Sequence, residues 1–219
     1  MISELKVMSC AARSTAKNFL DNYRYLKALE LLKKEVNNAR QKKIIIGAGG
    51  NVYPGWIATD IHNLDVTSEE NWTYVFVKNS IDNLLAEHVF EHLTLKQARK
   101  AFKLALQFLK PGGVFRLAVP DGLFPSEEYI NYVRPGGVGV GADDHKILYT
   151  YKTLEHELTE VGYSVNLLEF WNEKGTFVYN SWNTENCGMI KRSKNHDERN
   201  KNNDLKYTSL IVDAQKIPY

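Results

Sequence analysis

Cysteine is scarce in this sequence, and its two cysteines, Cys10 and Cys187, stand far apart without CxxC spacing. Isolated cysteines favour free thiols over a disulfide or a zinc site, and neither is a candidate for catalysis. Long apolar runs are also lacking, because none approaches the roughly 18 residues of a membrane span. The amino-terminal residues lack the pattern of a secretory signal. The sequence therefore predicts a cytoplasmic protein without a membrane span.

A surplus of charge is also absent, since 28 lysine and arginine residues balance 26 acidic residues to a formal net charge of +2. The basic residues are scattered, so no nucleic-acid-binding surface is expected. A length of 219 residues with 43% apolar content is typical of one globular domain with a substantial core. The composition leaves a small-molecule substrate as the expected partner and leaves a homo-oligomer open.

The stretch Ile44–Gly50 indicates a buried strand that ends at a ligand. Three consecutive isoleucines form the continuous apolar run of a strand buried on both faces, and Gly47, Ala48, Gly49 and Gly50 follow them. Glycines here let the backbone adopt positive φ or approach a ligand closely. Ligands of open α/β sheets bind at the carboxyl ends of the strands, so we expect a binding site at this loop.

A third glycine is missing from this loop, which separates two classes of cofactor. A dinucleotide fingerprint needs a glycine three residues after Gly49 and a helix facing the pyrophosphate, but Val52 stands there and Pro54 follows. The next predicted strand, Trp56–Ile61, carries Asp60 near its end, where a carboxylate binds ribose hydroxyls. The pattern therefore favours an adenosyl ligand without phosphates.

The rest of the chain alternates predicted strands and helices, which is typical of the α/β class. An amphipathic helix is expected between Ser14 and Arg40, either packed on the domain or acting as a lid over the ligand cleft. A capping box of Thr94 with Gln97 begins a further helix, and Gly162 ends another. Further strands are predicted at Trp72–Val77, Ser80–Ala86, Val114–Val119, Tyr163–Phe170 and Tyr207–Ala214.

Polar side chains follow two of these strands, and they are candidates for chemistry. Asp121 follows one strand, and the segment from Glu87 to His92 follows another. This segment also matches H-x-x-E-H, a zinc hydrolase pattern in which two histidines bind the metal and the glutamate activates water. That site needs both histidines within a helix, whereas these follow a strand. A zinc hydrolase is therefore a remote alternative.

Two long irregular segments, residues 123–150 and 171–206, interrupt the pattern. The first is rich in glycine, proline and aromatic residues, which favours a functional loop over disorder. It contains His145, a candidate general base near neutral pH. The second includes a polar run at residues 191–204 that is typical of a solvated loop. We expect the two segments to form a pocket for a substrate.

The motifs and their order resemble a class I S-adenosylmethionine (SAM)-dependent methyltransferase of type 11. The resemblance rests on Ile46–Gly50, Gly55–Asp60, Ile81–Asp82, Glu87–Leu93 and Leu109–Gly113. It implies an α/β three-layer sandwich with a seven-stranded, mostly parallel sheet whose last strand is antiparallel and lies beside the sixth. It also implies a single methyltransferase domain over residues 1–219, with residues 1–40 as a helical extension.

The same resemblance implies SAM as the cofactor and a methyl acceptor of small-molecule or glycan type. The expected cofactor-binding residues are Gly47, Ala48, Gly49, Gly50, Asp60, Ile61, Asp65, Glu87 and His88. In-line displacement at a sulfonium requires no metal, and none is expected. A base would assist a hydroxyl or amine acceptor, and the candidates are His145, His88, Glu91 and Asp121. The alternative from another class is a non-catalytic module that binds an adenosyl ligand.

Overall fold

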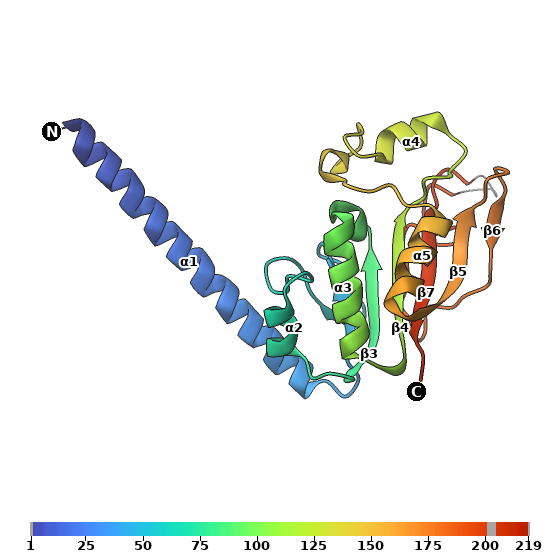
Figure 1. Cartoon of the computed structure of the whole chain (residues 1–219), viewed down its shortest axis with the longest axis horizontal. Helices are drawn as coiled ribbons and strands as arrows, with labels where there is room; N and C mark the ends of the chain where they lie inside the picture. The colour runs from blue at the N-terminus through green and yellow to red at the C-terminus, as the bar shows by residue number, and fades with distance from the viewer. Residues whose placement is uncertain (1, 201–204, 219) are drawn as a thin grey trace.

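A seven-stranded sheet forms the centre of the protein, with strand order β2-β1-β3-β4-β7-β5-β6 (Figure 1). The computed structural model describes residues 2–200 and 205–218, with side chains described from residue 20 onward. The strands are β1 (Lys43–Ile46), β2 (Ile57–Ala58), β3 (Ile81–Glu87), β4 (Leu109–Pro120), β5 (Tyr163–Trp171), β6 (Phe177–Tyr179) and β7 (Ser209–Lys216). The helices are α1 (Ile2–Asn38), α2 (Glu69–Val75), α3 (Leu95–Phe108), α4 (Glu127–Val133) and α5 (Tyr151–Val161), with 3₁₀ turns η1 (Phe90–His92) and η2 (Ala142–Asp144).

The sheet is mostly parallel, as predicted. β1 pairs in parallel with β2 and β3, and β3 pairs in parallel with β4. β7, the last strand, lies antiparallel between β4 and β5, which therefore run in the same direction. β6 adds a short antiparallel edge to β5 within the segment 171–206, where no strand was expected. The carboxyl ends of β1, β2 and β3 consequently share one edge of the sheet.

The isoleucines of β1 are buried on both faces of the sheet, as their continuous apolar run predicts. Ile44 and Ile46 belong to the main core, where the sheet packs against α1, α2, α3 and α5. Ile45 belongs to a smaller cluster on the opposite face, with Ile190 and the partly buried Trp182. Helices therefore cover one face, while the loops before β2 and after β6 cover the other (Figure 1).

The strand predicted at Trp72–Val77 is wrong, because these residues form most of α2 and the turn that follows it. Ser68 caps this helix by accepting a hydrogen bond from the backbone N–H of Asn71, and two glutamates occupy its first turn. The indole N–H of Trp72 donates to the carbonyl of Val66, 3.0 Å away, which fixes the buried ring against the core. Capping and tertiary packing thus outweigh the β propensity of aromatic and β-branched residues.

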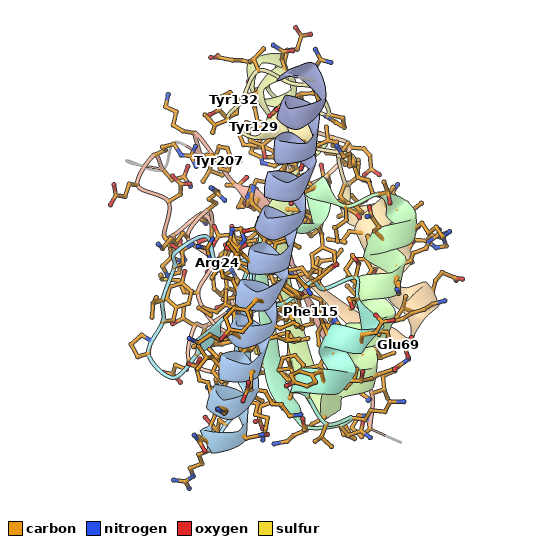
Figure 2. All side chains as sticks on the ribbon, turned by 90° about the vertical axis from the view of Figure 1, so that its left-hand side faces the viewer. Arg24, Glu69, Phe115, Tyr129, Tyr132 and Tyr207 are labelled. Atoms are coloured by element: carbon orange, nitrogen blue, oxygen red, sulfur yellow. The ribbon has the colours of Figure 1, made fainter. Side chains whose placement is uncertain are left out.

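The amino-terminal helix is longer than predicted and packs over only part of its length. It begins at Ile2 rather than near Ser14, and it projects away from the sheet (Figure 1). Leu29, Leu32 and Val36 are buried in the core, whereas nearer the amino terminus Tyr23 is 58% exposed. Figure 2 shows α1 crossing the front of the molecule. The packing hypothesis therefore holds for the last turns of the helix, from Leu29 onward.

Two predicted helix boundaries are confirmed by their capping geometry. Thr94 and Gln97 form the capping box that begins α3, and Gly162 ends α5 with a left-handed φ of 113°. Cys187 is a free thiol, while the side chain of Cys10 lies outside the described residues. Within the described ranges, no helix has the length and apolar character needed to cross a membrane.

Candidate functional site

Two adjoining pockets lie at the carboxyl ends of β1, β2 and β3, and Gly47, Gly49, His88 and His92 line both. The first, called here the apolar pocket, has a volume of about 480 Å³. Its other lining residues are Ile46, Asp60, Ile61, Leu64, Asp65, Val66, Val89, Leu93 and Asp144. The second, called the polar pocket, has a volume of about 370 Å³. Its other lining residues are Ala48, Asn51, Glu87, Glu91, Tyr132, Val133, Val140, Ala142, His145, Arg192, Arg199 and Tyr207.

The glycine loop after β1 has a backbone that only glycine adopts easily. Gly47 has a φ of 62°, and a Cβ there would lie 2.4 Å from Cγ2 of Val89. Gly49 also has positive φ, at 54°. Its backbone N–H donates a hydrogen bond to Oδ2 of Asp60 over 3.1 Å. The sequence therefore needs glycine at 47 for close approach to the segment after β3, and at 49 for the turn.

Asp60 and Asp65 line the apolar pocket from the segment that follows β2. Besides Gly49, the Asp60 carboxylate accepts the backbone N–H of Ile61 at 2.7 Å, so its orientation is fixed. Oδ1 of Asp65 accepts the backbone N–H and the hydroxyl of Thr67, each at 2.8 Å. Ile61 presents an apolar side chain that is 60% exposed. With Asp144 on its other side, the pocket thus combines apolar walls with three carboxylates.

Glu87, at the end of β3, anchors the segment 171–206 beside the glycine loop. Its two carboxylate oxygens accept the backbone N–H groups of Arg192 and Lys191, at 2.8 and 3.0 Å. The Lys191 ammonium also donates to Asn51, which follows the glycine loop. These contacts place Arg192 at the polar pocket.

His88 directly follows β3 in a left-handed conformation, with a φ of 56° that is uncommon for a residue with a side chain. Its Nε2 lies 2.8 Å from the hydroxyl of Ser209 on β7. Its Nδ1 lies 3.1 Å from Oε1 of Glu91, close enough for charge attraction. Both ring nitrogens therefore already have neighbours within the protein.

Glu91 is a completely buried carboxylate in the 3₁₀ turn η1. Burial raises its pKa, but the adjacent His88 and, to a lesser extent, a backbone N–H and His92 together lower the pKa below its usual value. From the residues that the structure describes, neither carboxylate oxygen accepts a well-aligned hydrogen bond. Its backbone carbonyl accepts the N–H of Lys146 over 2.6 Å, which brings the preceding residue, His145, to the same place.

His92 and His145 meet edge to face, with ring centroids 4.7 Å apart. Nδ1 of His145 lies 2.6 Å from the carbonyl of Val133 at the end of α4. Since a carbonyl only accepts, this nitrogen carries the proton, and Nε2 of the neutral ring keeps its lone pair. Nδ1 of His92 lies 3.4 Å from Oδ2 of Asp144. The structure therefore gathers Glu91, His92 and His145 at the junction of the two pockets.

Asp121 and Gly50 are the two sequence candidates that line neither pocket. The Asp121 carboxylate is fully buried and accepts the backbone N–H groups of Leu123 and Trp171, at 2.9 and 2.7 Å. Burial raises its pKa to about 6, although these two hydrogen bonds favour the charged form. Through these hydrogen bonds, Asp121 joins the segment after β4 to the end of β5.

Sequence reasoning did not select several residues of the polar pocket, including Tyr132, Arg192, Arg199 and Tyr207. Tyr132 and Tyr207 lie at the α4 end of the molecule (Figure 2). Arg199 lies over the Tyr207 ring, 3.7 Å from its centroid, and is paired with Asp197. Arginines within a polar run are typical of a solvated loop, so the sequence pattern did not mark Arg192 and Arg199 as pocket residues.

The H-x-x-E-H pattern does not have the geometry of a zinc hydrolase here. Its first histidine, His88, follows a strand, and its last three residues, Phe90–His92, form a single 3₁₀ turn. The two histidines therefore do not occupy successive turns of one α-helix, as that site requires. His88 also contacts Ser209 and Glu91 through its two ring nitrogens.

Comparisons with known proteins show what the fold resembles. No protein-family model and no curated protein matches the sequence. A SAM-dependent methyltransferase from Thermotoga maritima superposes with a TM-score of 0.50 at 12% identity, over 94% of this chain and 96% of that chain. A SAM-dependent methyltransferase from Archaeoglobus fulgidus gives a TM-score of 0.49 at 16% identity, over 85% and 94%.

The CurJ carbon methyltransferase gives a TM-score of 0.48 at 15% identity, over 88% of this chain but only 54% of that chain. This chain therefore spans about half of that structure, and nearly all of the two structures described before it. The chain has the Rossmann-like α/β fold of SAM-dependent methyltransferases.

Proposed function

We propose that this protein is a SAM-dependent methyltransferase that binds the adenosyl part of SAM in the apolar pocket and a methyl acceptor in the polar pocket. The observation that carries the proposal is the pairing of Gly49 with Asp60 at the edge where the two pockets meet. It puts a glycine backbone and a fixed carboxylate beside apolar walls. This arrangement suits an adenine, a ribose and a sulfonium in sequence.

The residues present fit such a cofactor. The apolar pocket, at about 480 Å³, is within the usual range for a site that binds a small molecule. Ile61, Leu64 and Val89 would contact the adenine, and Asp60 would accept hydrogen bonds from the ribose hydroxyls. In a dinucleotide-binding fold, a helix amino terminus binds the pyrophosphate. Here Val52 and Pro54 stand where that helix would begin, so a pyrophosphate would lack this partner. The site therefore favours SAM over a nicotinamide dinucleotide.

The chain's own contribution to methyl transfer would be orientation and exclusion of water, which can lower a barrier by roughly 7 to 11 kcal/mol. SAM supplies an electrophilic methyl group. At the end of β3, Glu87 lines the polar pocket and His88 lines both pockets, where the two residues would position the sulfonium against the acceptor. Nε2 of His145 offers a lone pair toward a hydroxyl or amine acceptor.

The polar pocket supports an acceptor that is a small polar molecule or a glycan. Arg192 and Arg199 line it together with Tyr132 and Tyr207. Arg199 is already paired with Asp197, whereas Arg192 is exposed. A guanidinium at the pocket favours an acceptor that carries a carboxylate or phosphate group.

Calorimetry with the full chain tests the cofactor, and a coupled assay tests the activity. We expect SAM and S-adenosylhomocysteine each to bind one site per chain, while NAD does not bind. Binding of NAD without SAM would overturn the proposal. Formation of S-adenosylhomocysteine from SAM should then depend on an added acceptor, and we expect polar, anionic compounds to support it. Cofactor binding without turnover on any acceptor would favour the non-catalytic binding module.

A further inference from the structure

We propose that Glu91, His92 and His145 form a binding site for one divalent transition-metal ion at the junction of the two pockets. One ligand atom from each residue lies within 4.8 Å of the ligand atoms of the other two. Around a single Zn²⁺ ion, with bonds of about 2.0 to 2.2 Å, ligand atoms stand about 3 to 4 Å apart. Small rotations of the three side chains would therefore close the site around an ion.

The Glu91 carboxylate is the observation that points to a cation. Its side chain is 0% exposed, and within the described part of the chain neither oxygen accepts a well-aligned hydrogen bond. A buried carboxylate without a partner is costly, so native sites pair it with a cation or a metal. His88 approaches to 3.1 Å but is also held by Ser209 at its other nitrogen. His88 reaches only Oε1, so a metal ion would supply a partner for Oε2, which has none among the described residues.

The two histidines are oriented as metal ligands commonly are. A metal-bound histidine usually donates its other ring N–H to a carbonyl or a carboxylate, which fixes the ring and the tautomer. Nδ1 of His145 donates to the Val133 carbonyl at 2.6 Å, and Nδ1 of His92 faces the Asp144 carboxylate at 3.4 Å. Nε2 of each ring is then the nitrogen with a free lone pair.

The backbone holds the three ligands from two separate segments. Glu91 and His92 belong to η1, and His145 follows η2. The carbonyl of Glu91 accepts the N–H groups of Lys146 and Ile147, at 2.6 and 3.2 Å, which joins the segments beside the ligands. Backbone hydrogen bonds between the two segments therefore hold the three ligands in place.

Two imidazoles and one carboxylate suit Zn²⁺, Mn²⁺ or Fe²⁺ better than Mg²⁺ or Ca²⁺, and they leave coordination positions open. The three residues line the polar pocket, so an acceptor oxygen could fill an open position. The ion would lower the pKa of that hydroxyl, whose proton passes to solvent. The acceptor oxygen then bonds to the methyl carbon of SAM as the bond from that carbon to sulfur breaks, and S-adenosylhomocysteine leaves. Only this last role rests on the proposed function, and His145 serves there as a ligand rather than as the base.

Metal binding is tested on the full chain after treatment with EDTA and without SAM, so its outcome is independent of methyl transfer. Titration with Zn²⁺ and with Mn²⁺ should give one site per chain. Glu91→Gln and His145→Ala should each weaken binding at least about tenfold, as loss of a ligand or its support does. His156→Ala, which removes an exposed histidine on α5, should leave the affinity unchanged. Absence of a stoichiometric site would overturn the proposal.

Two further measurements distinguish this site from a metal site built on different ligands. Loss of binding in His88→Gln but not in His145→Ala would assign the ion to the H-x-x-E-H residues and overturn the proposal. The second measurement adds Co²⁺ to the unmodified chain, so its result does not depend on whether a variant folds. We expect visible absorption from nitrogen and oxygen ligands, and a thiolate charge-transfer band from Cys187 would overturn the proposal.

Discussion

The backbone N–H of Gly49 donates a hydrogen bond to Oδ2 of Asp60, and this 3.1 Å contact joins the glycine loop after β1 to the segment after β2. Oδ1 of the same carboxylate accepts the N–H of Ile61. Two hydrogen bonds therefore fix the carboxylate at the rim of the apolar pocket before any ligand arrives. Such preorganisation lowers the entropic cost of binding.

Asp60→Asn should weaken SAM binding. The amide keeps the size of the side chain but removes the charge, and hydrogen bonds to a charged group contribute about 1.5 to 3 kcal/mol, or at least about tenfold in affinity. Calorimetry on both proteins gives the ratio of dissociation constants. Asp21→Asn, at an exposed position of α1, is the matched control and should bind SAM as the unmodified chain does. Equal affinities for Asp60→Asn and the control would argue against a ribose contact at Asp60.

Gly47→Ala should lower the free energy of unfolding more than Gly49→Ala. Both positions have positive φ, which costs an alanine about 1 to 2 kcal/mol. Only at Gly47 would the new Cβ also clash, because Cγ2 of Val89 lies 2.4 Å away, whereas nothing lies within 4 Å at Gly49. Urea unfolding measures the difference.

A double-mutant cycle with Val89→Ala isolates the clash. If the clash is real, Gly47→Ala costs less in the Val89→Ala background than in the unmodified chain. Strictly additive effects of the two substitutions would mean that φ alone accounts for the loss.

The glycine loop also shows how far sequence reasoning reaches. The isoleucine run, the loop and Asp60 are local patterns, so the strand, its burial on both faces and the position of the acid were all predictable. α2 was mistaken for a strand because the packing of Trp72 against Phe108, whose ring centroid lies 5.4 Å away, is a tertiary contact that the local sequence does not show. The first turn of that helix did carry a signal, since Ser68 precedes two glutamates.

The junction of the two pockets was predictable only in part. Glu87 and His88 follow a predicted strand, and the sequence placed them near the ligand for that reason. The meeting of His145 with His92 depends on the hydrogen bond between Lys146 and the Glu91 carbonyl, a pairing of two irregular segments. No periodic pattern marks such a pairing. Asp121 ends a strand as well, yet two backbone N–H groups occupy it away from the pockets.

The free energy of unfolding should fall as the pH rises from about 4 to about 6, because the buried carboxyl of Asp121 loses its proton in this range. Burial raises the pKa of Asp121 from 3.8 to about 6 in the folded chain, so the folded state holds this proton more tightly than the unfolded state. The resulting stabilisation is fully present below about pH 4 and is lost as the pH rises through about 6, and it amounts to about 3 kcal/mol. The measurement is the free energy of unfolding in urea, followed across this pH range.

Asp121→Asn provides the comparison, since it removes the titrating group. The difference in unfolding free energy between the unmodified chain and Asp121→Asn should shrink by up to about 3 kcal/mol between pH 4 and pH 7. Glu185→Gln, which changes an exposed carboxyl, is the control for general charge effects. A difference that stays constant with pH would show that Asp121 is ionised throughout.

Substitution of Arg116 should be among the most destabilising changes in the sheet. Arg116 joins β4 to β7 and to the loop after β6, which covers the face of the sheet that has no helices. Its guanidinium makes a bidentate pair with Asp213, at 2.7 and 2.8 Å, and Nη1 donates to the carbonyls of Asn183 and Gly188. The group is 4.7 Å from the Trp182 ring centroid, and Arg116 is 2% exposed.

Arg116→Ala leaves the Asp213 carboxylate and two carbonyls without their donor, and we expect a loss of about 3 to 5 kcal/mol in the free energy of unfolding. Arg116→Lys keeps the charge but not the planar fork, so it should recover only part of this stability. Lys110→Ala breaks a partly exposed ion pair with Asp82 at the sheet's edge and should cost about 1 kcal/mol. Hydrogen exchange should also show faster exchange at residues 183–188 in Arg116→Ala. Equal stabilities for Arg116→Ala and Lys110→Ala would mean that packing alone holds the loop on the sheet.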